Sequence, residues 1–251
     1  MHISNKGCNF AAYLTPPYTF LYRQASPEEA FYMFLFMEKT IVYVDGFNFY
    51  YGLKRQKAID KDWKKFYWID FVKLFEQFLG KNQILEKVFY FTATPLNIQK
   101  SSRQSALLNA NKLINNIRFE VIKGKYYDKH IICPFCKAAI SKPEEKRTDV
   151  NISVQIMEDC VLNKVDNIVL VTADSDLLPP LLFIKRHFTN TKIKIYFPPN
   201  GFSSDLNNFL KTNKNKVVKL EHNKVKFINS ILPDIVSKDG KTYTIPDKWK
   251  I

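Results

Sequence analysis

Short, almost continuously apolar runs alternate along this chain with stretches in which apolar residues recur at helical spacing. The apolar runs are rich in β-branched and aromatic side chains, which predicts buried strands over residues 40–45, 87–92, 167–172 and 192–197. The stretches between them predict helices over residues 69–79, 101–115, 148–162, 177–187 and 204–210. Alternation of this kind is typical of a parallel sheet with helices on both faces. We therefore predict an α/β fold, a three-layer sandwich with a mainly parallel central sheet.

Less regular segments lie between these elements. Residues 117–123 alternate apolar and polar positions and are predicted to be an edge strand. We expect a loop after residue 45 and an irregular polar segment over residues 126–145. Thr148 is suited to cap the start of its helix, and Gly80 to cap the end of the helix before it.

The ends of the chain differ from its middle. Residues 1–36 are rich in aromatic residues and have no clear period, so we expect a non-native extension with Met37 as the natural start. The main domain is predicted over residues 37–222, with an irregular cysteine-containing insertion at about 126–147. Residues 223–251 are expected to form a C-terminal tail that packs on this domain.

Two of the apolar runs end in acidic residues. Asp45 closes the first run, and Asp174 and Asp176 follow the run that ends at Thr172. In a parallel sheet with right-handed connections, the loops after the strands gather along the carboxyl edge, where ligands bind. Carboxylates that meet there repel one another unless a cation neutralises them, and their oxygens suit Mg²⁺ or Mn²⁺. The pattern therefore predicts an acidic edge that could hold a hard cation.

Each of these residues also has an ordinary structural interpretation. Asp45 could form a turn, and Asp174 or Asp176 could cap the helix that follows. Asp149 lies in the first turn of a predicted helix, where the helix dipole favours an acid without any further role. Asn48 could bond only to its own loop. The coincidence of acids at two strand ends in a basic protein favours a functional role.

Charge narrows the choice of partner. The 251-residue chain has a formal net charge of +14 at pH 7. A protein this basic commonly binds an anionic partner, most often nucleic acid. A lysine-rich surface can also be solvated without binding any partner. A basic surface around an acidic pit is the charge arrangement expected of a nuclease.

Cysteine content and hydropathy bear on the compartment. The four cysteines are too few and too scattered for a disulfide-stapled secreted domain. No apolar run approaches the ~20 residues that a membrane-spanning helix needs. We therefore expect a cytoplasmic protein without a membrane partner.

Cys133 and Cys136 form a Cys-x-x-Cys pair, with His130 three residues before it. Such a pair is half of a tetrahedral zinc site, and no fourth ligand is near in sequence. Cys8 and Cys160 are candidates only by elimination. A redox pair would stand at the start of a helix that follows a strand, which this segment does not resemble. We favour an unliganded loop over a zinc site.

A lysine-rich stretch follows the last predicted helix. Its lysines include Lys211, Lys214, Lys216 and Lys219. They could follow the phosphates of a nucleic acid, with Phe209 and Phe227 stacking on its bases. Lysines also protect exposed sheet edges, and this interpretation is equally open.

Three motifs together resemble the NYN domain, in its LabA-like branch, within the PIN-like nuclease superfamily. They are VYVDGFNFYYG at residues 42–52, EEKRTDVNI at 144–152 and VTADSDLLP at 171–179. The resemblance spans roughly residues 38–200 in matching order and spacing. It implies a PIN-like (Rossmannoid) sheet whose carboxyl edge carries acids that coordinate Mg²⁺ or Mn²⁺ for RNA hydrolysis.

The resemblance also implies roles for individual residues. Asp45, Asp149 and Asp174 match the metal-binding acids, and Asp176 matches a further acid that is a ligand or lies just outside the ligands. Asn48 matches an asparagine that orients Asp45 or the substrate. These residues are the expected catalytic set of a metal-dependent endoribonuclease acting on single-stranded RNA, with a homodimer left open.

Two other classes of function were weighed. A catalytically silent PIN-like module would bind RNA or a protein without cutting it. A phosphohydrolase of the haloacid-dehalogenase type would need a nucleophilic Asp two residues before the Asp-Gly pair, where this chain has Tyr43. The second class is therefore disfavoured.

Overall fold

The computed structural model describes residues 36–213 and 215–250, with the side chains of 128–131 and 140–145 outside the description. The predicted extension therefore falls, apart from Phe36, outside the described residues. The chain divides into two units, Met1–Met37 and Glu38–Ile251, and the second is described by itself. None of the helices in the described part of the chain has both the length and the apolar composition needed to cross a bilayer.

A six-stranded sheet with all neighbours parallel forms the centre of the domain, in the order β3-β2-β1-β6-β7-β8. Its strands are β1 (Glu38–Asp45), β2 (Gln83–Thr92), β3 (Phe119–Lys123), β6 (Asn167–Val171), β7 (Lys192–Phe197) and β8 (Val218–Lys219). The predicted strands are therefore all present, and β3 is an edge strand as expected. Strand β1 pairs with β6 in parallel, and Val44 of β1 lies beside Val171 of β6.

Helices cover both faces of the sheet. The helices are α2 (Gly46–Ile59), α3 (Phe71–Glu76), α4 (Ile98–Asn115), α5 (Thr148–Val161), α6 (Leu178–His187), α7 (Ser204–Thr212) and α8 (Lys224–Ile228). Along β1, Val42 and Val44 join the core beneath α2, α3, α4 and α8, whereas Ile41 and Tyr43 join the core beneath α5, α6 and α7. The predicted three-layer α/β sandwich is confirmed.

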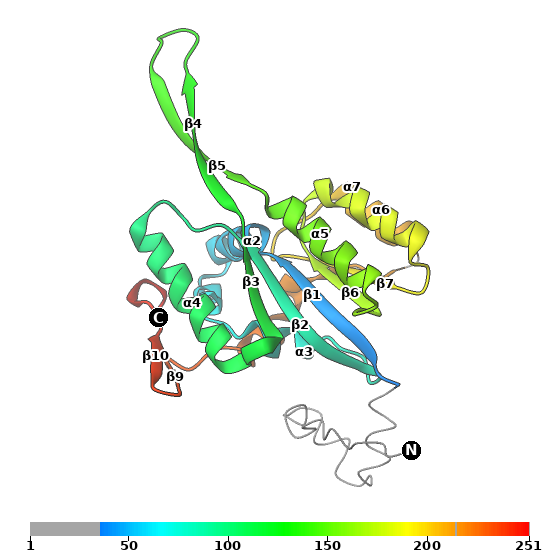
Figure 1. Ribbon diagram of the computed structural model, residues 1–251. Helices are drawn as coiled ribbons and strands as arrows, with labels where there is room; N and C mark the ends of the chain where they lie inside the picture. The colour runs from blue at the N-terminus through cyan, green and yellow to red at the C-terminus, as the bar shows by residue number, and fades with distance from the viewer. Residues whose placement is uncertain (1–35, 214, 251) are drawn as a thin grey trace, which may run out of the picture. The chain divides into compact units, whose positions relative to one another are not determined.

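Between β3 and β6 the chain crosses from one side of β1 to the other. It first builds β1, β2 and β3 toward one edge, and then returns to place β6 on the other side of β1 (Figure 1). The boundary between β1 and β6 is therefore the point where the strand order reverses. Open α/β sheets bind their ligands outside the carboxyl ends of the strands at such a point.

A β-hairpin replaces the irregular segment expected over residues 126–145. Strands β4 (Lys125–Ile132) and β5 (Ala139–Lys146) pair along their whole length and extend away from the sheet (Figure 1). The expectation was wrong because it relied on a buried apolar face to reveal a strand.

Other predicted boundaries also need correction. The loop expected after residue 45 is α2, which begins at Gly46. Helix α3 is shorter than predicted and ends at Glu76, so Gly80 is not its cap. Thr148 is the first residue of α5, and Arg147 is the cap, with a left-handed φ of 77°.

The lysine-rich region contains little strand. Only Val218 and Lys219 form β8, and a short 3₁₀ helix and α8 follow. The chain then forms a second hairpin of β9 (Ile235–Lys238) and β10 (Lys241–Thr244). Val236, Ile245 and Trp249 join the core beneath α2 and α4, so this tail packs on the domain.

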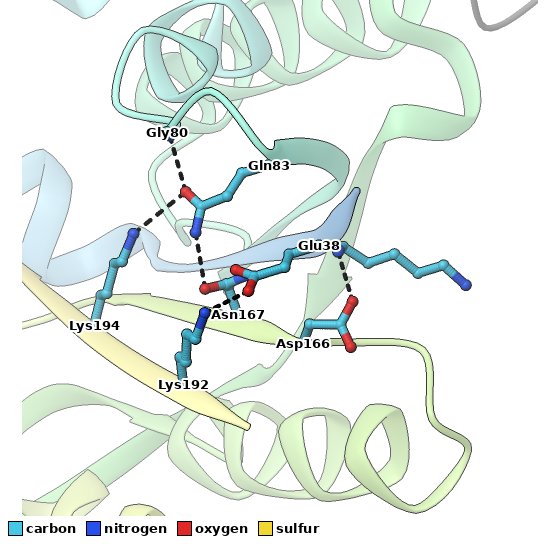
Figure 2. Close-up of polar contacts among 8 residues, drawn as sticks. Glu38, Gly80, Gln83, Asp166, Asn167, Lys192 and Lys194 are labelled. Atoms are coloured by element: carbon cyan, nitrogen blue, oxygen red, sulfur yellow. Dashed lines mark hydrogen bonds and ion pairs between the residues drawn. The ribbon is translucent and has the colours of Figure 1, made fainter. Parts of the chain in front are cut away.

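Polar side chains fix the amino-terminal edge of the sheet (Figure 2). The Gln83 amide donates to Oδ1 of Asn167 at 2.8 Å, and the Asn167 amide donates to Glu38 at 3.0 Å. Lys192 pairs with Glu38, and Lys194 donates to Gln83 at 3.3 Å. These side chains thus link β1, β2, β6 and β7 at the amino-terminal edge of the sheet.

Candidate functional site

Asp45 and Thr172 lie side by side at the carboxyl edge. Asp45 is the last residue of β1, and Thr172 directly follows β6, whose residue Val171 is paired with Val44. The Thr172 hydroxyl donates to Oδ2 of Asp45 at 2.9 Å. Both residues are buried, with exposed fractions of 2% and 0%. A carboxylate this deeply buried needs hydrogen-bond donors, and Thr172 supplies one of them.

Asn48 supplies two more donors to the same carboxylate. Its backbone N–H donates to Oδ1 of Asp45 at 3.0 Å, and its side-chain amide donates to Oδ2 at 2.5 Å. Asp45 therefore caps the N-terminus of α2. The two donors and Thr172 hold the carboxylate in one orientation.

Gly46 allows a close approach between α2 and β2. A Cβ at Gly46 would lie 2.5 Å from the carbonyl oxygen of Phe91 and 2.5 Å from the ring of Tyr90. Among described glycines, only Gly240 has a positive φ, so Gly46 is not needed for an unusual backbone turn. Close packing against β2, and not an unusual backbone turn, therefore explains the glycine at this position.

Asp174 is linked to Asp45 through Thr172. The backbone N–H of Asp174 donates to Oγ1 of Thr172 at 3.1 Å, while the Thr172 hydroxyl donates to Asp45. Oδ1 of Asp174 accepts from the N–H of Asp176 at 3.0 Å and caps a short 3₁₀ helix. Thr172 was not among the predicted site residues. Its signal in the sequence was a hydroxyl between the apolar run and the first acid of the loop.

Asp149 comes to this edge from the start of α5. Its helix has no side-chain cap, and the base of the β4–β5 hairpin packs against its first turn. A Cβ at Gly124 would lie 2.8 Å from Oγ1 of Thr148 and 2.7 Å from the carbonyl oxygen of Lys146. The hairpin base therefore positions the first turn of α5, which carries Asp149.

The pKa of Asp149 shows that the acids share one electrostatic environment. Loss of solvent around its carboxyl group, and then repulsion from Asp174, Asp45 and Asp176, raise this pKa to about 6. Burial raises the pKa of Asp45, which its hydrogen bonds from Asn48 and Thr172 oppose and the charge of Asp174 reinforces. Four carboxyl groups from three separate segments thus act on one another.

The donor set fits a hard divalent cation. Carboxylate oxygens are the ligands that Mg²⁺ and Mn²⁺ prefer, and a cation would relieve the repulsion that raises these pKa values. Within the described residues, no group of three or more His, Cys, Asp or Glu side chains is already gathered into a metal site. Binding would therefore have to draw the carboxylates of Asp45, Asp149 and Asp174 together. Asp176, exposed on the 3₁₀ helix, lies farther out in the loop.

The two aromatic residues predicted to accompany the lysine surface are not available to a ligand. Phe209 and Phe227 are both buried, in the cores on opposite faces of the sheet, so they cannot stack on a ligand. Lys219 lies in edge strand β8, and Lys211 and Lys216 are exposed nearby in the sequence. Lys214 lies outside the described residues. The stacking prediction was wrong because aromatic residues beside lysines look the same in a sequence whether buried or exposed.

Cys133 and Cys136 lie in the turn of the β4–β5 hairpin. The backbone N–H groups of Cys136 and Phe135 donate to the sulfur of Cys133 and lower its pKa. The Lys137 N–H donates to the carbonyl oxygen of Cys133 at 3.0 Å and closes the turn. The side chain of His130 lies outside the description. The described residues of this turn thus provide two thiols as zinc ligands. Zinc binding here stays a hypothesis, which the zinc content of the purified chain would decide.

Comparison with known proteins shows what this chain is similar to. The family model described as "NYN domain" matches residues 39–212. The curated 6-hydroxy-3-succinoylpyridine 3-monooxygenase HspA of Pseudomonas putida (strain DSM 28022 / S16) is 28% identical over 84% of this chain and 75% of its own length. The crystal structure of VPA0982, a protein of unknown function from Vibrio parahaemolyticus RIMD 2210633, has a TM-score of 0.48 and 18% identity, over 78% of this chain and 98% of its own. The family match runs from β1 to α7 and includes all four acids.

Proposed function

The chain belongs to the NYN domain family, within the PIN-like nuclease superfamily, and from this premise we propose that it is a metal-dependent ribonuclease that cuts RNA internally. One observation carries the proposal. Burial of its carboxyl group, and then repulsion from the carboxyl groups of β1 and of the β6 loop, raise the pKa of Asp149 to about 6. Such a cluster on a chain of net charge +14 is suited to hold a cation beside a polyanion.

The residues of the cluster would have different tasks. Asp45, Asp149 and Asp174 would hold Mg²⁺ or Mn²⁺, and Asp176 would contribute from the outside of the loop. A bound cation of this kind polarises a phosphodiester and lowers the pKa of a water molecule. Asn48 and Thr172 would keep the Asp45 carboxylate ionised and oriented through the hydrogen bonds described above.

Cleavage of RNA with no free ends tests the proposal. Circular single-stranded RNA is incubated with the chain and Mn²⁺, and linear products are followed on a denaturing gel. We expect cleavage that EDTA abolishes and that falls by at least about 100-fold in Asp45→Asn and in Asp174→Asn. Cleavage that persists in both variants would reveal a contaminant, and cleavage of linear RNA alone would overturn the internal mode of cutting.

A matched control comes from α7. Asp205 lies exposed in the first turn of its helix, as Asp149 does in α5, but outside the acidic cluster. Asp205→Asn should therefore leave cleavage unchanged, whereas Asp149→Asn should reduce it. Equal effects of both changes would point to helix stability and not to the site.

The alternative proposal is a catalytically silent module that binds RNA or a protein. It would be favoured if the wild-type chain bound single-stranded RNA but cut none in Mn²⁺ or Mg²⁺. The monooxygenase name belongs to the curated relative, and at 28% identity it supplies a second activity to assay. Consumption of 6-hydroxy-3-succinoylpyridine that is lost in Asp174→Asn would contradict the hydrolase proposal.

A further inference from the structure

A row of aromatic side chains runs along the exposed side of α2. It consists of Phe47, Tyr50 and Tyr51 of α2 and Tyr126 of β4. The ring centroid of Phe47 lies 5.9 Å from that of Tyr51 and 5.8 Å from that of Tyr126. The ring centroids of Tyr50 and Tyr51 lie 5.5 Å apart. The other side of α2 is buried through Phe49 and Leu53. The row is therefore not part of the core that α2 needs in order to fold.

The two tyrosines are the exposed part of this aromatic row. Tyr51 is 44% exposed and Tyr50 is 38% exposed, while Phe47 and Tyr126 are half-buried. Tyr50 is supported from beneath by the buried Tyr67, at 5.6 Å between centroids, and Tyr67 stacks in turn on Trp249 at 5.7 Å. The aromatic row is thus a rigid platform, because its exposed rings rest on fixed ones.

The aromatic row borders the acidic cluster at two points. Phe47 lies between Asp45 and Asn48 in sequence, within the first turn of α2. Tyr126 lies at the base of the hairpin, whose other strand leads directly through Arg147 to Asp149 (Figure 1). A ligand that reaches the acids from this side would meet the aromatic row next.

Cations accompany the row. The Nζ atom of Lys54 lies 5.8 Å from the ring centroid of Tyr51, and the charge of Arg103 acts on the Tyr50 hydroxyl. Exposed rings and neighbouring cations are the two components of a surface that binds single strands without reading sequence.

We propose that this aromatic row is a base-stacking platform for single-stranded RNA, in which bases leaving the acidic cluster stack on Tyr51 and Tyr50. The inference rests on the proposed function in taking the strand to be RNA. Every base has a flat π-face, so the platform would accept any sequence. Paired bases within a duplex already stack on one another, so the platform selects unpaired strands.

Binding without hydrolysis tests this inference. Fluorescence anisotropy measures the affinity of the full chain, in EDTA, for a labelled eight-nucleotide single-stranded RNA and for an abasic strand of the same length and charge. We expect the intact RNA to bind more tightly than the abasic strand. Tyr51→Leu should weaken binding of the intact RNA by about tenfold, and Tyr51→Phe should leave it within about twofold.

Two comparisons separate stacking from a loss of structure. Phe183 of α6 is also 44% exposed, and Phe183→Leu should leave RNA binding unchanged. The abasic strand should bind wild type and Tyr51→Leu equally. Equal affinity of wild type for intact and abasic strands, or an equal loss for both strands in Tyr51→Leu, would overturn the proposal.

The outcome is separable from that of the hydrolase proposal. If the chain cuts no RNA but shows Tyr51-dependent binding, the platform stands and the ribonuclease proposal fails. If the chain cuts RNA while Tyr51→Leu binds and cuts like wild type, the ribonuclease proposal stands and the platform is wrong.

Discussion

The hydroxyl of Thr172 donates to Oδ2 of Asp45 at 2.9 Å and accepts the backbone N–H of Asp174 at 3.1 Å. One buried side chain thus connects the acid at the end of β1 with the acid in the loop after β6. The connection forms at the point where the strand order of the sheet reverses. The geometry of the acidic cluster therefore depends on a residue that carries no charge.

Replacing Thr172 by valine keeps the shape and removes the hydroxyl. Asp45 would lose a donor, and the half-buried N–H of Asp174 would lose its acceptor. We expect cleavage to fall by about 10- to 100-fold, as for other groups that orient metal ligands. Unfolding by urea should show a loss of about 1–3 kcal/mol. Thr172→Ser keeps the hydroxyl and should stay near wild type, and full activity in Thr172→Val would contradict this role.

The raised pKa of Asp149 predicts how the stability of the metal-free chain depends on pH. Its folded pKa of about 6 exceeds the ordinary value of 3.8, so the folded state holds this proton more tightly than the unfolded state. The contribution to stability is thus present below about pH 4 and is lost as pH rises through about 6. Asp149→Asn removes the repelled charge and should raise the melting temperature in EDTA at pH 7.5.

The size of this effect is limited because Asp149 is exposed to solvent. Screening limits the gain to about 1 kcal/mol, which corresponds to roughly 2–4 °C in a domain of this size. At pH 4.5 the two proteins should differ less. A variant that melts below wild type at pH 7.5 would show that the acids do not repel one another as described.

Gly46 should tolerate no side chain. A Cβ there would lie 2.5 Å from both the Phe91 carbonyl oxygen and the Tyr90 ring. We expect Gly46→Ala to lower the free energy of unfolding in urea by about 1–3 kcal/mol. Gly80→Ala is the control, since its Cβ would lie 3.5 Å from its nearest neighbour, and should change stability by no more than about 0.5 kcal/mol. Equal effects would place α2 farther from β2 than described.

The cysteines should differ in reactivity. Backbone N–H groups lower the pKa of Cys133 in the hairpin turn, whereas burial raises the pKa of Cys160 to about 11. Iodoacetamide at pH 7.5, after treatment with a chelator, should therefore modify Cys133 at least about tenfold faster than Cys160. Peptide mapping by mass spectrometry measures both rates, and equal rates would contradict the described hairpin turn.

The sequence predicted the sheet because its strands are buried on both faces and therefore read as apolar runs. It did not reveal α2, because Tyr50, Tyr51 and Phe47 on the exposed side obscure the helical period of Phe49 and Leu53. The same exposed rings that hid the helix now form the aromatic row. A helix that carries a ligand surface can thus escape a prediction that looks only for one apolar face.

The candidate site was predictable in part. Strand ends placed Asp45 and Asp174 on one edge by topology alone. Asp149 could not be placed that way, since it lies at the start of a helix and not at the end of a strand. Only the family resemblance grouped it with the other acids. Thr172 was missed because one hydroxyl after an apolar run is a weak signal, and its partner Asp45 lies 127 positions away in the sequence.

Mn²⁺ binding measured by titration calorimetry tests the central claim, that these acids form one divalent-cation site. The account predicts saturable binding at pH 7.5 that weakens below about pH 6, as Asp149 takes up a proton. Binding should weaken at least about tenfold in Asp45→Asn and in Asp174→Asn, and remain intact in Asp205→Asn. Absence of binding to the wild-type chain at millimolar Mn²⁺, or equal binding by all four proteins, would contradict it.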